Sequence, residues 1–347
     1  MLDAAFVFPA IKGFQAQRAY YISMVPLGII PKLFRFIDDD LPPEIRAQRT
    51  LNKTRIPEMS AYILENRDSY VFSSLTVSVD APIAFQPIND ETPNIGHLRI
   101  PMDARFLIND GQHRQAAIAE AIKVNPELMK EHISVVFYKD EGLQRSQQMF
   151  SDLNRYAIRP TKSINILYNS REEDSIIAKR IVEEVDVFRG LTEKEKTAIS
   201  NRSKALFTLS AICTATNELV KGLPITTEQK SRLAIDFWNT VETYIPEWVQ
   251  VKSGTIRSCQ LRQESICSFS ITLVALGAAG ATLINQFPDT WKKRLSKLLQ
   301  VNWRKSNPLW EGLVFVNGRV AANRSTQKAM NNYMIDFLTK DSGGNDA

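Results

Sequence analysis

The chain has 347 residues, of which 44% are hydrophobic and 23% charged, and it carries a formal net charge of +5 at pH 7. This composition is that of a globular and not of a disordered protein. The length exceeds what one hydrophobic core usually organises, which predicts two domains or one large domain with an appended helical part. Its three cysteines and three histidines show no paired metal-ligand spacing, so neither a metal site nor a disulfide framework is expected.

The N-terminal segment lacks a basic stretch followed by an apolar core, so no secretory signal is expected. The most apolar run, 269–284, is shorter than the roughly 20 residues that cross a bilayer. It also contains Ser270, Thr272 and Thr282. We therefore expect a cytoplasmic protein without a membrane partner, in which this run forms a buried helix.

The first part of the chain alternates proline-punctuated segments with short β-type runs, such as 70–72 and 75–79. Helical spacing covers 58–65. Further along, 105–109 predicts a strand, 112–123 a helix and 133–138 another strand. This strand-helix-strand order predicts an α/β domain over residues 1–145.

The remainder of the chain is predicted to be mostly helical. Helical periodicity covers 146–154, 172–185, 193–220, 229–244, 259–284 and 289–299. We assign a mainly helical domain with a basic C-terminal segment to residues 146–340 and a disordered tail to residues 341–347. The predicted fold class is α/β (α+β).

The turn between strand 105–109 and helix 112–123 predicts an anion-binding site. Gly111 allows unusual backbone angles, and Asp110 is suited to cap the amides that follow. A helix N-terminus attracts phosphate, to which Arg114 adds a forked contact. His113 is able to relay a proton, and Gln112 completes the turn. The alternative is a structural capped turn in which Arg114 pairs with an acid such as Glu120.

A second polar group is predicted at a helix end that is stopped by Pro160. Asn154, Arg155 and Arg159 lie there, near enough in sequence to the turn to contact the same phosphate or nucleotide. The alternative is a solvated basic helix end.

The strongest charge asymmetry lies in residues 291–328. Nine basic residues stand there against one acid, Glu311: Lys292, Lys293, Arg294, Lys297, Arg304, Lys305, Arg319, Arg324 and Lys328. Basic side chains neutralise DNA phosphates, and the interleaved Trp291, Trp303 and Trp310 either stack on bases or anchor the segment in the core. We predict DNA contacts by Lys292, Lys293, Arg294, Arg304, Lys305, Arg319 and Arg324.

Two smaller basic groups are further candidates for DNA contacts. Arg49 and Arg55 belong to a cluster with Arg46 and Lys53 that has near-helical spacing, although the preceding acids offer internal partners. Arg202 opens an apolar helical segment, where it either contacts phosphate or only supports the helix start. No P-loop or dinucleotide-binding glycine pattern is present in the sequence.

Several motifs together resemble the DndB family of DGQHR-domain proteins. They are Phe-Leu-Ile-Asn-Asp-Gly-Gln-His-Arg at 106–114, Ser-Gln-Gln-Met-Phe-Ser-Asp-Leu-Asn-Arg at 146–155, Ser-Asn-Arg-Ser-Lys-Ala-Leu-Phe at 200–207 and the segment 303–312. Segments 27–34 and 47–57 extend the resemblance over nearly the whole chain. DndB proteins are encoded with the bacterial DNA phosphorothioation (sulfur modification) system.

The resemblance implies a negative regulator that binds double-stranded DNA at the promoter of the modification operon and is not needed for the sulfur chemistry. It also implies a first domain similar to the ParB and sulfiredoxin fold, in which a comparable turn meets nucleotide phosphates. His113 stands where ParB-type turns usually have an arginine. A homo-oligomer is expected, since two-fold dimers usually read palindromic operators.

Two other functions remain open from the sequence. A ParB-like nucleotide hydrolase or nuclease would bind a nucleoside triphosphate with Mg²⁺ at the turn, with Asp110 or His113 as the catalytic candidates. A scaffold would instead contact other proteins of the modification system.

Overall fold

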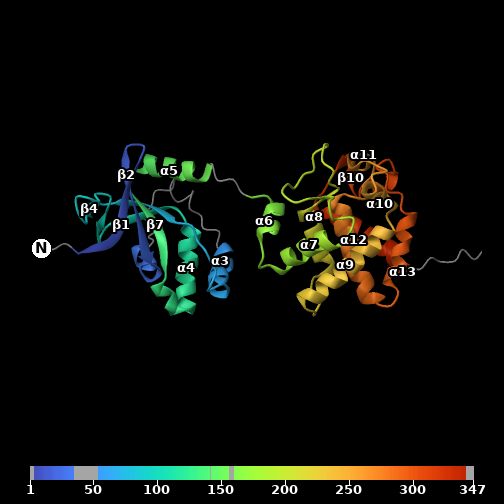
Figure 1. Ribbon diagram of the computed structural model, residues 1–347, viewed down its shortest axis with the longest axis horizontal. Helices are drawn as coiled ribbons and strands as arrows, with labels where there is room; N and C mark the ends of the chain where they lie inside the picture. The colour runs from blue at the N-terminus through green and yellow to red at the C-terminus, as the bar shows by residue number, and fades with distance from the viewer. Residues whose placement is uncertain (1–3, 35–53, 141, 156–159, 341–347) are drawn as a thin grey trace, which may run out of the picture. The chain divides into compact units, whose positions relative to one another are not determined.

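The computed structural model describes residues 4–34, 54–140, 142–155 and 160–340. The chain divides into two compact units, Met1–Ile158 and Arg159–Ala347, and each is described by itself. The first unit is built on a sheet and the second on packed helices (Figure 1), so the α/β (α+β) class is confirmed. Within the described ranges, no helix has both the length and the apolar content needed to cross a membrane.

A mixed seven-stranded sheet forms the centre of the first unit. Its strands are β1 (Ala5–Gln15), β2 (Arg18–Pro26), β3 (Leu75–Asp80), β4 (Ala84–Pro87), β5 (Ile95–Pro101), β6 (Arg105–Asp110) and β7 (His132–Lys139). Their order is β4-β5-β1-β2-β7-β3-β6, in which β3 runs parallel to β7 and antiparallel to β6. Alternate residues of β7, including Val135 and Phe137, are buried, because successive side chains of a strand point to opposite faces.

Four helices accompany this sheet among the described residues of the first unit. They are α1 (Ile30–Leu33), α3 (Arg55–Glu65), α4 (Gln112–Val124) and α5 (Leu143–Arg155). Helix α4 buries Ala117, Ile118 and Ala121 in the core that it shares with β3 and β7, and it packs against α3. The predicted helix 112–123 is therefore confirmed as α4.

The β1–β2 hairpin was not predicted from the sequence. Its two-residue turn consists of Ala16 and Gln17, with φ of 49° and 63°, and is closed by the Gln15–Arg18 pair. Such turns usually contain glycine, asparagine or aspartate, which tolerate positive φ. Because those residues are missing, the sequence carries no hairpin signal here.

The second unit consists mainly of helices. They are α6 (Lys162–Tyr168), α7 (Glu173–Glu184), α8 (Leu209–Val220), α9 (Thr227–Thr243), α10 (Pro246–Lys252), α11 (Ser258–Glu264), α12 (Ser270–Gln286), α13 (Trp291–Leu295) and α14 (Arg324–Thr339). Four two-residue strands form two small sheets: β8 (Thr192–Glu193) with β9 (Phe207–Thr208), and β10 (Phe315–Val316) with β11 (Arg319–Val320).

Helix α12 is the predicted buried helix, and it packs against both α8 and α14. A Cβ atom on Gly277 would lie 2.0 Å from the carbonyl oxygen of Ala215 in α8. A side chain at this position would therefore prevent the present approach of the two helices.

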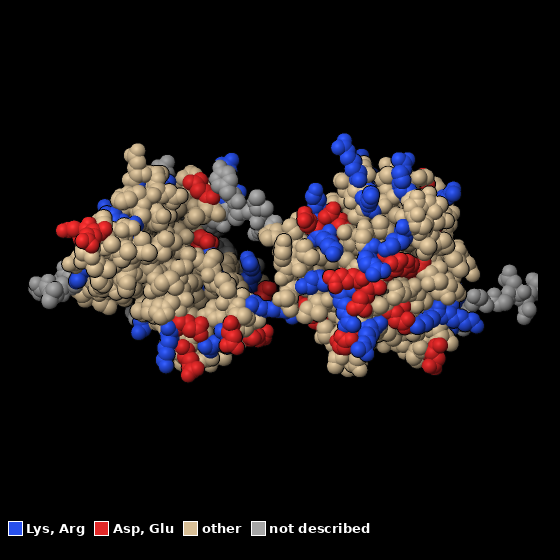
Figure 2. Space-filling view, viewed as in Figure 1, with Lys and Arg blue, Asp and Glu red and all other residues tan. Residues whose placement is uncertain are grey.

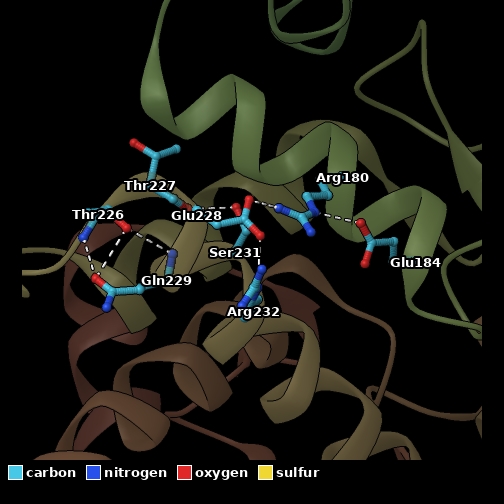
Figure 3. A network of polar contacts seen from close by, with 8 residues as sticks. All are labelled: Arg180, Glu184, Thr226, Thr227, Glu228, Gln229, Ser231 and Arg232. Carbon is cyan, nitrogen blue, oxygen red and sulfur yellow. Dashed lines mark hydrogen bonds and ion pairs between the residues drawn. The ribbon is translucent and has the colours of Figure 1, made fainter.

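An ion-pair network joins α7 to the start of α9 (Figure 3). Arg180 donates to Glu184 at 2.5 Å and also to Glu228, which accepts from Arg232 at 2.8 Å. Thr226 caps α9 in a reciprocal arrangement with Gln229. The charges in this part of the second unit therefore pair with one another and do not form a surface of one sign.

Three sequence-based assignments of secondary structure are wrong. Residues 70–72 are not a strand, because the Val71 amide donates to the Tyr62 hydroxyl at 2.9 Å. Helix formation in 193–220 begins only at Leu209. The predicted helix 259–284 is interrupted between α11 and α12, where the Ile266 amide donates to the Trp303 carbonyl at 3.0 Å. In the first and third cases the backbone amide bonds to a partner outside the predicted strand or helix, which a local sequence pattern does not reveal.

Candidate nucleic-acid and nucleotide sites

The sequence-predicted turn lies between β6 and α4. Gly111 is the N-cap residue of α4 and has φ of 103°, a conformation that favours glycine. A Cβ atom at this position would lie 2.4 Å from Cδ2 of Leu75 in β3. The turn therefore requires glycine both for its backbone angles and for its contact with the sheet.

Asp110 does not cap α4, contrary to the prediction. Among the described residues, no side-chain cap hydrogen bond is formed at the start of this helix. The Asp110 carboxylate instead accepts from Arg114 Nη2 at 2.6 Å, and Arg114 also donates to the Ser73 hydroxyl. An arginine one helical turn away competes for the carboxylate because a charged, forked donor binds it more strongly than a neutral amide.

Arg114, which the sequence predicts to contact phosphate, already has two partners, Asp110 and Ser73. Its side chain is 13% exposed, and it pairs with Asp110, while Glu120 pairs with Lys123 at 2.8 Å. The alternative, in which Arg114 pairs with a nearby acid, is therefore observed, but the acid is Asp110 and not Glu120. A phosphate at the turn would share the Arg114 guanidinium with the Asp110 carboxylate, which adds negative charge beside the ligand.

Arg55 and His113 are brought together by the packing of α3 against α4. Burial, and then the positive charge of Arg55, lower the pKa of His113 from 6.5. The imidazole is therefore predominantly neutral at pH 7 and has the protonation state of a general base. The neighbouring Gln112 donates to the Ile108 carbonyl at 3.3 Å, which is a contact within the turn.

Helix α5 places the second predicted polar group. Arg155 is its last residue and Asn154 precedes it, while Arg159 lies outside the described residues. The helix contacts β6 through Met149, whose Sδ accepts a hydrogen bond from the side-chain Nδ2 of the buried Asn109 at 3.2 Å. The strand leading to the turn is thus in contact with α5, and the joint use of Asn154 and Arg155 with the turn stays a prediction.

The three tryptophans of the basic C-terminal stretch belong to the core. Trp291, Trp303 and Trp310 are 7%, 3% and 0% exposed, and Trp303 stacks on Trp310 with 6.0 Å between ring centroids. Of the two alternatives, the tryptophans therefore anchor the segment in the core. Their rings are too buried to stack on bases.

The basic residues of this stretch have different partners within the protein. Lys292 pairs with Asp236 at 2.6 Å, and Arg294 donates to the Thr339 carbonyl at 2.9 Å. Lys297 donates to the Lys340 carbonyl. The last two contacts place cations at the C-terminal end of α14, where they stabilise the partial negative charge of the helix.

The other predicted DNA contacts lie elsewhere in the chain. Lys293, Arg319 and Arg324 are exposed, on α13, on β11 and at the first residue of α14. Lys305 is half-buried with its ammonium group 4.8 Å from the ring centroid of Phe269, and burial lowers its pKa. Arg49 lies outside the described residues.

Long-range hydrogen bonds gather a basic surface around α11. The side chain of Arg262 donates to the carbonyls of Ser200, Ser203 and Ala205, and Ser258 donates to the carbonyl of Lys204. The segment that carries Arg202 and Lys204 is thereby held against this helix.

The C-terminal end of α11 is joined to the segment that carries Arg304. Ser265 and Arg304 form an antiparallel bridge, and the Lys305 amide donates to the Glu264 carbonyl at 2.9 Å. We define the α11 surface by the exposed side chains of Arg202, Lys204, Arg257, Gln260, Gln263 and Arg304. One exposed acid of α11, Glu264, borders it at the C-terminal end of the helix.

Figure 2 shows basic side chains with few acids among them along the edge of the second unit that carries α11, whereas both signs mix farther down. The hydrogen bonds of Ser258 and Arg262 and the Ser265–Arg304 bridge join the segments of the predicted residues Arg202 and Arg304 to α11. Lys204, Arg257, Gln260 and Gln263 were not predicted, because nothing in their local sequence shows that three distant segments meet.

Comparison with known protein families identifies a family that covers most of the chain. The DndB family, described as DNA-sulfur modification-associated, matches residues 8–341, which is nearly the whole chain. Neither the curated proteins nor the solved structures give a match, so the likeness of the first unit to ParB and sulfiredoxin stays a prediction. The extent of the family match confirms the resemblance seen in the motifs, and the chain belongs to the DndB family of proteins associated with DNA sulfur modification.

Proposed function

We propose that this protein is a DNA-binding negative regulator of the genes for DNA sulfur modification. The observation that carries the proposal is the α11 surface, which gathers four exposed cations from segments far apart in the sequence. Such a surface suits the phosphates of double-stranded DNA, since each contact releases condensed counterions. Membership of a family associated with DNA sulfur modification supports the same target.

Binding to promoter DNA is the first test. Fluorescence anisotropy should give tighter binding to the promoter of the modification genes than to a scrambled duplex of equal length. The logarithm of the binding constant should fall linearly with the logarithm of the salt concentration, as expected for phosphate contacts. A reporter gene behind this promoter should be repressed by the protein. Equal affinity for both duplexes at physiological salt would refute the proposal.

A homodimer is the proposed binding form, because a two-fold protein matches a palindromic operator. Light scattering of the protein with and without the promoter duplex measures the stoichiometry. Two chains per duplex are expected, and one chain per duplex would contradict this part of the proposal.

A second candidate function is nucleotide hydrolysis at the turn before α4. The lowered pKa of His113 favours it, because a neutral imidazole is able to accept a proton from an attacking water. In this function a nucleoside triphosphate with Mg²⁺ would lie at Gly111, Gln112 and Arg114, and Asp110 would orient the metal or the water. The pairing of Asp110 with Arg114 argues against nucleotide hydrolysis, because each of these side chains already occupies the other.

Phosphate release distinguishes this second function. The wild type, Arg114→Ala and His113→Gln are compared with ATP and Mg²⁺, with and without the promoter duplex. A hydrolase would lose most of its activity in both variants. Absence of phosphate release from the wild type under all conditions would remove this candidate and leave the regulator unaffected.

A further inference from the structure

Helix α11 presents two glutamines to solvent from one face. Ser258 and Leu261 are buried and fix the inner side of the helix, whereas Gln260 and Gln263 are exposed. Residues three positions apart lie on the same face of a helix. The two carboxamides therefore point away from the core as neighbours.

Cations lie on both sides of these glutamines. Arg257 directly precedes the helix, and Arg202 and Lys204 are in the segment that Arg262 and Ser258 hold by its carbonyl groups. Arg304 follows at the other end through its bridge to Ser265. The exposed helix thus has neutral hydrogen-bonding groups at its centre and positive charge at its start. At its end the exposed Glu264 lines the same pocket as Arg304, so both signs are present there.

We propose that α11 enters the major groove of DNA, where Gln260 and Gln263 read base edges while Arg202, Lys204, Arg257 and Arg304 contact the flanking phosphates. This inference rests on the proposed function and identifies the residues that determine its sequence specificity. A glutamine carboxamide donates and accepts at once, which matches the N6 and N7 edge of adenine.

The dimensions and the charge pattern favour duplex DNA over RNA. The major groove of B-DNA, about 12 Å wide, admits a helix of about 10–12 Å diameter with its side chains. In double-stranded RNA the major groove is too deep and narrow for such reading. Flanking arginines also fit phosphate oxygens through their forked donors.

The double variant Gln260→Ala, Gln263→Ala tests the reading of bases. Its affinity for the promoter duplex should fall about tenfold or more, because each good base contact discriminates by about 1–3 kcal/mol. Its affinity for the scrambled duplex and its salt slope should not change. The matched control, Gln286→Ala with Gln300→Ala, removes two exposed glutamines outside the α11 surface and should behave as the wild type.

The variant Arg257→Ala, Arg304→Ala tests the phosphate contacts. It should weaken binding to both duplexes and reduce the salt slope by about two, one for each lost phosphate contact. Lys292→Ala with Lys293→Ala, on α13, should leave both affinities near the wild-type values. The reverse result for these two pairs would move the DNA contact to the stretch predicted from the sequence and overturn the inference.

Cys259 provides a measurement that does not depend on substitutions. It is half-buried on α11, whereas Cys213 and Cys267 are buried, so a thiol-alkylating reagent should react first at Cys259. Saturating promoter duplex should slow this reaction about tenfold or more. An unchanged rate would exclude α11 from the interface.

The outcomes separate the two proposals. Promoter preference retained by Gln260→Ala, Gln263→Ala, with circular dichroism equal to that of the wild type, refutes base reading by α11 and leaves the regulator intact. Absence of promoter preference in the wild type refutes both.

Discussion

At the scale of single residues, His113 links the packing of the first unit to pH. Burial and the charge of Arg55 lower its pKa, so the folded state disfavours the imidazolium form. The unfolded chain binds a proton near pH 6.5, whereas the folded protein binds it only at lower pH. The stability that this residue contributes is therefore present above pH 6.5 and is lost as the pH falls below that value.

The titration of His113 is directly measurable. In an NMR titration its imidazole should have a midpoint below 6.5, and the variant His113→Gln identifies its signal among the three histidines. The free energy of unfolding should fall less between pH 7 and pH 5.5 in this variant than in the wild type. A midpoint at or above 6.5 would contradict the observed burial and the proximity of Arg55.

Gly111 is the second residue whose replacement has a defined consequence. Alanine there would combine a positive φ with a Cβ atom 2.4 Å from Leu75, and we expect a loss of about 1–3 kcal/mol. Gly142 is a matched control, because it has φ of 99° and nothing within 4 Å of its added Cβ. Urea denaturation followed by circular dichroism should show a smaller loss for Gly142→Ala. Equal losses would mean that the Leu75 side chain moves away from the added Cβ atom without lowering the free energy of unfolding.

At the scale of elements, the β1–β2 hairpin has a turn whose residues are unusual for its geometry. Ala16 and Gln17 both have positive φ, which non-glycine residues adopt at a cost of order 1 kcal/mol or more each. The long pairing of β1 with β2 and β5 holds the turn in this form. The right-handed twist of the strands favours such a turn, so the sheet overrides the local preference.

A better turn sequence should therefore stabilise the hairpin. The double substitution Ala16→Asn, Gln17→Gly should raise the free energy of unfolding by about 1 kcal/mol, since asparagine and glycine tolerate positive φ. Ala16→Pro should have the opposite effect, because proline requires φ near −65°. Urea denaturation measures both. Stabilisation by proline, or destabilisation by the Asn-Gly pair, would show that the turn has another conformation.

At the scale of the whole molecule, the two units have separate hydrophobic clusters. One cluster lies within residues 8–137 and the other within residues 166–338. All five tryptophans belong to the second unit: Trp238, Trp248, Trp291, Trp303 and Trp310. Tryptophan fluorescence therefore reports the unfolding of the second unit alone.

Separate cores predict that the units unfold independently. Gly111→Ala should leave the midpoint of the tryptophan fluorescence transition in urea unchanged, while circular dichroism should show an earlier component from the first unit. The positive control is Gly277→Ala in α12, which should lower the fluorescence midpoint, since its Cβ would meet the Ala215 carbonyl. A fluorescence midpoint that moves with Gly111→Ala would show that the units unfold as one.

Some features of this protein follow from the sequence by itself. The turn at Gly111 and the helix after it depend on neighbouring residues, and the apolar run of α12 is long enough to predict burial. The α+β class follows from such local patterns. Membership of the DndB family is likewise contained in motifs that extend over the chain.

Other features were decided only by the tertiary structure. Asp110 accepts from Arg114 and does not cap α4, and the tryptophans of the basic stretch lie in the core, which divides that stretch into cations with different partners. The α11 surface depends on Arg262, whose contacts reach carbonyls about 60 residues away in sequence. Periodicity and charge counts describe neighbours along the chain, whereas these hydrogen bonds join segments that become neighbours only on folding.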